Sequence, residues 1–71
     1  MPKLPHISGR EAVRALQKLG FEVARQKGSH IVMKRGSDGC VVPNHPEIKT
    51  GTLAGVLRQA GVSADEFIAA L

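Results

Sequence analysis

The sequence has few of the residues that build covalent or metal-held scaffolds. Cys40 is its only cysteine, so an internal disulfide is impossible and a zinc site with two or more thiolates is excluded. The first residues are polar and interrupted by Pro2 and Pro5, unlike a secretory signal. No apolar run approaches the roughly 20 residues of a membrane helix. These absences predict a cytoplasmic protein that lies in no membrane.

Aromatic residues are also scarce. The chain has no tryptophan or tyrosine, and both phenylalanines, Phe21 and Phe67, fall at positions predicted to face the core. No ring is then left to stack on exposed bases, which argues against the RNA-recognition-motif and cold-shock modes of binding.

A chain of 71 residues predicts one domain over residues 1–71, with residues 1–7 as an extended leader. So small a domain leaves little room for a deep pocket, so a site on an open face is expected, which suits a polymeric substrate. Ten basic and six acidic residues give a net charge of +4. This charge favours a polyanion or an acidic protein surface as partner, although a merely solvated basic surface fits it equally well.

Helix signals stand at the two ends of the sequence. Ser8 and Glu11 have the spacing of a capping box, and the apolar stripe after them predicts a helix that ends at Gly20. A second helix is expected from a cap at Thr50 or Thr52 to Gly61, and a short third helix after a capping box at Ser63 and Glu66.

Between the first two helices, apolar residues recur at every second position. This period predicts strands over residues 21–26, 30–35 and 40–42. In the first, half-buried strand, Val23 and Arg25 are expected on one face. In the second strand, Ile31 and Met33 share one face, and the other face carries His30, Val32 and Lys34.

The predicted fold class is α+β. Short connections make the three strands an antiparallel sheet, and the helices must cover one face of it while the other stays in water. The order α-β-β-β-α is that of the double-stranded-RNA-binding fold. The fold analogy strengthens the expectation of RNA but does not establish it.

The most suggestive polar cluster is Gln26-Lys27-Gly28-Ser29-His30. Gly28 and Ser29 allow a tight turn, from which His30 would project beside Lys27, with Lys34 on the same face and Arg35 close by. RNA cleavage without a metal needs a base for the 2′-hydroxyl and cations for the phosphate, and histidine titrates near neutral pH. From spacing alone, an ordinary surface histidine remains the commoner interpretation.

A second cluster, Lys49 to Thr52, begins the second predicted helix, where free amides and a lysine can bind an anion. From the sequence alone, an ordinary helix cap is the commoner interpretation of these residues. His45 lies in a loop that could reach the site, and His6 is expected to be solvated. The three histidines and Cys40 lack a compact ligand spacing, so no metal or other cofactor is expected, and Cys40 is predicted to be a core residue.

These segments resemble the HicA (YcfA-like) toxins over nearly the whole chain. The resemblance rests on the coupling of the Gly-Ser-His turn to a downstream Gly-Thr-Leu helix start. The similar segments are Leu19-Gly20-Phe21, residues 25–30, Val42-Pro43, residues 49–53 and Arg58-Gln59-Ala60-Gly61.

The resemblance implies an mRNA-cleaving toxin with a double-stranded-RNA-binding-type fold and a HicB-type antitoxin as neighbour and inhibitor. It also implies that His30 is catalytic. Many members have a second histidine directly after this one, where the present chain has Ile31. Because alternate strand residues point to opposite faces, we expect this departure to be tolerated.

The sequence thus predicts a metal-independent endoribonuclease of a toxin–antitoxin system, with mRNA and an acidic, adjacently encoded HicB-like antitoxin as partners. The predicted catalytic residue is His30. A non-catalytic RNA-binding module and a basic protein-interaction domain are the alternatives. The residues expected to hold RNA or its phosphate are Lys27, Gly28, Ser29, Lys34, Arg35, Lys49, Thr50 and Thr52.

Overall fold

The computed structural model describes residues 3–71, and its elements follow the predicted order. Residues 1–2 of the predicted leader lie outside the described range. The elements are α1 (Gly9–Lys18), β1 (Glu22–Lys27), β2 (His30–Arg35), β3 (Asp38–Pro43), α2 (Thr50–Ala60) and α3 (Ala64–Ala69). No helix in this range is long and apolar enough to cross a membrane.

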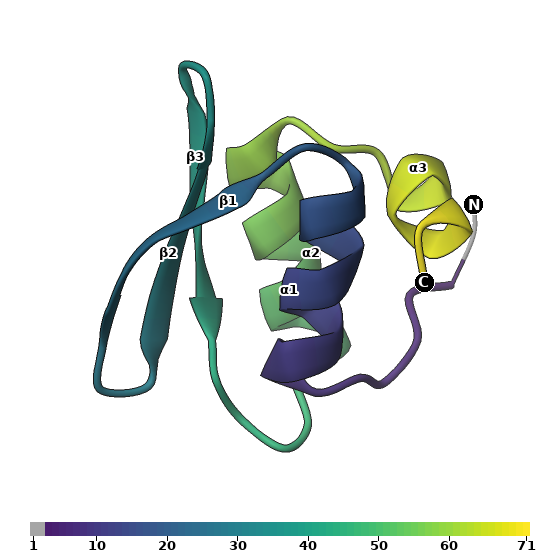
Figure 1. The fold of residues 1–71 in the computed structure, drawn as a ribbon. Helices are drawn as coiled ribbons and strands as arrows, with labels where there is room; N and C mark the ends of the chain where they lie inside the picture. The colour runs from purple at the N-terminus through teal and green to yellow at the C-terminus, as the bar shows by residue number, and fades with distance from the viewer. Residues whose placement is uncertain (1–2) are drawn as a thin grey trace.

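The fold has two layers, as Figure 1 shows. The strands form an antiparallel sheet in the order β1-β2-β3, so β1 and β3 are its edges. Helices α1 and α2 lie side by side on one face of this sheet, and no helix of the described residues covers the other face (Figure 1). The predicted α+β architecture, with helices on one face, is therefore confirmed.

The core lies between the sheet and the two long helices. Phe21 and Cys40 are buried there, Cys40 as predicted, and Phe67 of α3 is buried in the same hydrophobic cluster. Burial also raises the pKa of the Cys40 thiol above its ordinary value of 9.0, because an apolar environment disfavours the thiolate. The largest fully buried side chains are Phe21, Phe67, Leu16, Met33, Ile48, Leu53 and Val42.

The N-termini of α1 and α3 are capped as the sequence predicts, and the N-terminus of α2 is not. Both capping boxes form, at Ser8 with Glu11 and at Ser63 with Glu66. The predicted threonine cap of α2 is wrong, because the N-cap residue is Lys49 and no side chain caps it. Lys49 occupies this place because its backbone is extended directly after Ile48, whose amide donates to the Ile7 carbonyl.

Strand β1 differs most from its prediction. All six of its residues are exposed, whereas a half-buried strand was expected. Because β1 is an edge strand, α1 is the element that faces it on the helix side of the sheet. A pocket lies between α1 and β1, so α1 does not bury the residues of β1. The pairing with β2 is also irregular, because Val23 pairs with Met33 and Arg25 with Val32. A β-bulge at Ala24 therefore reverses the alternation.

Strand β3 is longer than the predicted 40–42. Asp38 pairs with Arg35 and Pro43 with His30, so the ladder uses every residue of β2. The connecting turn then has only two residues, Gly36 and Ser37, and Gly36 takes the positive φ of 58° that such a turn needs.

The segment before α1 is tied to the loop after β3. The bridge between Ile7 and Ile48 buries both side chains. Gly9 is also buried, and its amide donates to the His45 carbonyl over 2.9 Å. A Cβ at Gly9 would lie 2.3 Å from the Pro43 carbonyl oxygen, so only glycine permits this approach. The start of α1 is thereby held against the end of β3.

Candidate active site

His30 is the first residue of β2 and lies on the sheet face that no helix covers. Its neighbour Ile31 is buried among the helices, so alternation directs His30 to the open side. The ring is exposed, as predicted, and within residues 3–71 its nitrogens take part in no hydrogen bond or ion pair. The imidazole is therefore free to meet a substrate.

Basic side chains surround His30 on this face. Lys27 is its partner in the last pair of the β1–β2 ladder, and Lys34 lies on the same side of β2. These three residues line one shallow hollow of about 720 Å³. The rest of its lining is Ala24, Arg25, Val32 and Val41. The predicted association of His30, Lys27 and Lys34 is therefore present in the structure.

Arg25 is a cation of this face that sequence reasoning missed. Simple alternation placed it on the same face of the strand as Val23. The bulge between Val23 and Arg25 instead pairs Arg25 with Val32, whose side chain faces the hollow. A bulge depends on how two strands pair, and nothing in the sequence of β1 alone signals it.

Arg35 lies apart from His30. Its guanidinium carbon is 4.5 Å from the centre of the Phe21 ring, and one terminal nitrogen donates to the Leu19 carbonyl over 3.0 Å. Another terminal nitrogen lies 3.5 Å from the Asp38 carboxylate. These contacts lie on the helix side of the sheet, so we leave Arg35 out of the phosphate site.

The start of α2 does not line the hollow either. Thr50 lines a separate pocket with Lys3, Leu4 and His6 on the side of the N-terminal segment. His6 itself lies 3.1 Å from the carboxylate of Glu47, and both side chains are 68% exposed. Lys49 and Thr52 are exposed, with no side-chain hydrogen bond in the described chain. Any contact between this helix start and RNA would involve a part of the polymer beyond the hollow.

The turn before His30 is open to solvent. Gly28 has φ of 58° and nothing within 4 Å of the place where a Cβ would stand. The Ser29 carbonyl accepts a 2.7 Å hydrogen bond from the Asn44 amide, which ties the hairpin to the loop after β3. Gly28 and Ser29 thus hold His30 in place and leave room for a large ligand.

The described residues contain no group of three histidine, cysteine or acidic side chains that could hold a metal ion. What the hollow does offer is one exposed imidazole among three cations, on a face wide enough for a polymer. This arrangement can bind a phosphodiester and move a proton beside it.

A family model described as HicA toxin of bacterial toxin–antitoxin systems matches residues 9–62. The chain belongs to the HicA toxin family. The HicA match spans all three strands and both long helices, including His30 and the three cations around it, and leaves α3 outside. A toxin role follows from membership, together with an antitoxin as partner. A sequence comparison with curated proteins gave no match.

Proposed function

We propose that this HicA toxin is an endoribonuclease that cuts single-stranded or loosely structured mRNA by transphosphorylation, without a metal ion, and acts in the cytoplasm. The observation that carries the proposal is the joint placement of His30, Lys27, Lys34 and Arg25 on the uncovered face. A single RNA strand can reach this face because no helix or loop of residues 3–71 covers it.

In this reaction the 2′-oxygen of a ribose attacks the adjacent phosphorus and the 5′-oxygen of the next nucleotide leaves. The products are a 2′,3′-cyclic phosphate and a 5′-hydroxyl end. His30 is assigned as the general base or acid, because an exposed imidazole can take the 2′-hydroxyl proton or return one to the leaving oxygen.

The second proton-transfer group has two candidates that the geometry supports. Lys27 faces His30 across the last pair of the ladder and carries a proton that it can donate. Water has free access to the open hollow. His45, a third candidate from the sequence, is exposed on the loop after β3 but does not line the hollow.

The cations have a separate task. Negative charge grows on the non-bridging oxygens as phosphorus becomes five-coordinate, and fixed positive groups stabilise it. Arg25 pairs with Val32 across the sheet, Lys34 lies two residues further along β2, and both line the same hollow as His30. We assign them, together with Lys27, to holding the phosphate.

The same face supports a proposal for the antitoxin. An acidic, HicB-like protein encoded next to the toxin would be attracted to the three cations and would bury His30 when bound. Such a partner inhibits by occupying the place of RNA, without any change in the toxin's fold.

His30→Ala tests the catalytic assignment, with His45→Ala as the matched histidine control. We expect His30→Ala to abolish growth arrest on expression and cleavage by purified protein, because no other imidazole lines the hollow. Its circular dichroism should be unchanged, since an exposed side chain contributes little to stability. His45→Ala should retain activity.

Two results would contradict the proposal. A folded His30→Ala protein that still arrests growth while binding RNA would indicate a non-catalytic RNA-binding module. A protein with no affinity for RNA, whose partner binding persists at high salt, would indicate a protein-interaction domain.

A further inference from the structure

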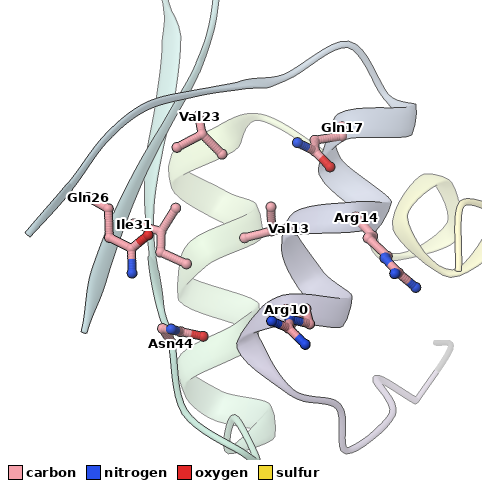
Figure 2. A pocket seen from close by; sticks show the side chains of 8 residues that line it. All are labelled: Arg10, Val13, Arg14, Gln17, Val23, Gln26, Ile31 and Asn44. Carbon is pink, nitrogen blue, oxygen red and sulfur yellow. The ribbon is translucent and has the colours of Figure 1, made fainter. Parts of the chain in front are cut away.

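A second recess lies on the other face of the sheet, between α1 and β1. Figure 2 shows it, with α1 on one side and the strands on the other. Its volume is about 660 Å³, within the range of small-ligand sites. We call it the α1–β1 groove. Its lining residues are Arg10, Val13, Arg14, Gln17, Val23, Gln26, Ile31 and Asn44.

The floor of the α1–β1 groove is apolar. Val13 projects from α1 toward Ile31 of β2, and Val23 of β1 lies above them in the view of Figure 2. Val23 is 44% exposed, the largest exposure of a bulky apolar side chain within either long helix or the sheet. An apolar floor with polar groups around it is the usual lining of a ligand site.

The rim of the groove is polar. Three amide side chains, Gln17, Gln26 and Asn44, stand around the floor, and Arg10 lies at the end near Asn44 (Figure 2). Arg14 points away toward α3 in this view, and it also lines a small pocket there with Lys18. None of the lining residues is acidic. Arginine and amides around an apolar floor match a nucleotide, which has an anionic phosphate, a flat base and a hydrogen-bonding base edge.

We propose that the α1–β1 groove binds one nucleotide of the RNA substrate and selects its base. The base lies over Val13, Val23 and Ile31, and its edge meets the amides of Gln17 and Gln26. Arg10 holds the phosphate. This inference rests on the proposed RNA cleavage and adds a specificity site to it.

The groove and His30 are connected through the ladder. The pair Gln26–Ile31 lines the groove on the helix side, and the next pair, Lys27–His30, lies on the open side. The exposed turn Gly28–Ser29 follows the Lys27–His30 pair at this end of the hairpin, so it lies next to both the groove and the hollow. An RNA strand that passes around this turn reaches both sites, so the groove holds a nucleotide close in sequence to the cut.

An acidic segment of the antitoxin is the other occupant to consider. It would satisfy Arg10, but it would leave the side-chain amides of Gln17 and Asn44 without a defined role, and that of Gln26 with only its 3.4 Å hydrogen bond to the Gly28 carbonyl. Amides both donate and accept hydrogen bonds, and they pair with the edges of bases. The lining therefore favours RNA.

The test uses the His30→Ala protein, in which RNA is bound without being cut. The probes are fluorescent single-stranded RNA hexanucleotides that differ in base at one position, and affinity is measured by anisotropy. Arg10→Ala is compared with Lys18→Ala, which removes an exposed cation from the same helix outside the groove. We expect Arg10→Ala to weaken binding about tenfold and Lys18→Ala less than about twofold.

The base-reading part is tested by Gln17→Ala, an exposed change that breaks no hydrogen bond of the described chain. Hexanucleotides that the parent protein distinguishes by base should bind Gln17→Ala with affinities within about a factor of two of one another. Retained discrimination in this variant would overturn the assignment of base selection to the groove.

The remaining outcomes separate the two proposals. If Arg10→Ala binds RNA as the parent does while Lys27→Ala binds it weakly, the groove proposal is overturned and the proposed function stands. If the parent binds no hexanucleotide, both are overturned. If Arg10→Ala weakens only the complex with the antitoxin, the groove is a protein-docking surface and the inference is wrong.

Discussion

Arg35 holds its guanidinium over the ring of Phe21, with 4.5 Å from the guanidinium carbon to the ring centre. The same side chain donates to the Leu19 carbonyl and lies near Asp38. Arg35 therefore ties the end of β2 to the connection between α1 and β1. Its chain neighbour Lys34 is exposed on the opposite face and lines the hollow around His30.

Two adjacent basic residues should consequently have separable effects. We expect Arg35→Ala to lower the free energy of unfolding by about 1–2 kcal/mol, through loss of the carbonyl hydrogen bond and the cation–π contact. Lys34→Ala should leave stability within about 0.5 kcal/mol of the parent but weaken RNA binding. Urea denaturation and RNA anisotropy on both variants give the comparison. If Arg35→Ala and Lys34→Ala had the same stability and lost the same RNA affinity, the separate roles assigned to the two residues would be contradicted.

Gly9 and Gly55 make a matched pair of helical glycines. An added Cβ at Gly9 would meet the Pro43 carbonyl oxygen at 2.3 Å, whereas one at Gly55 would meet nothing within 4 Å. We expect Gly9→Ala to destabilise the fold by about 1–3 kcal/mol through this backbone clash. Gly55→Ala should stabilise it by about 0.5–1 kcal/mol, because alanine loses less backbone entropy in a helix. Thermal and urea unfolding measure both, and a neutral Gly9→Ala would mean that α1 can move away from β3 at little cost.

Cleavage should not depend on a divalent metal. The residues that line the hollow with His30 are cations and apolar side chains, so they offer a metal ion no carboxylate or thiolate ligand. The proposed chemistry needs only proton transfer and fixed positive charge. We expect purified protein to retain its cleavage rate within about twofold in excess chelator. A loss of activity that magnesium restores would contradict the proposed mechanism.

Charge reversal at Lys27 and Lys34 together tests whether RNA and the antitoxin share one surface. We expect the double variant Lys27→Glu, Lys34→Glu to bind RNA more weakly and to associate with the antitoxin about tenfold or more slowly at low salt, because both ligands are attracted by the same field. The measurements are RNA affinity and association rate at two salt concentrations. If the double variant lost RNA affinity but associated with the antitoxin as fast as the parent, the antitoxin would have to inhibit by binding another surface.

Much of the fold was predictable because its signals are local. Each of these signals acts within a few residues. The capping boxes form at Ser8 and Ser63, and the helices α1 and α2 are followed by glycines with positive φ, Gly20 and Gly61, as expected. Alternation within β2 likewise placed His30 on the exposed side and Ile31 in the core, because side-chain direction in a regular strand depends only on residue parity.

The features that the sequence did not reveal arise where two segments meet. The bulge at Ala24 exists only in the pairing of β1 with β2, and it moves Arg25 to the face of His30 and Gln26 to the groove. Lys49 begins α2 because Ile48 is bound to Ile7, far away in the chain. The sequence by itself determined the elements, the open basic face and the position of His30, since each depends on neighbours along the chain. Only the tertiary structure decided which cations join His30 and where a second recess opens, because register, edge position and the spacing between layers are set by contacts between distant residues.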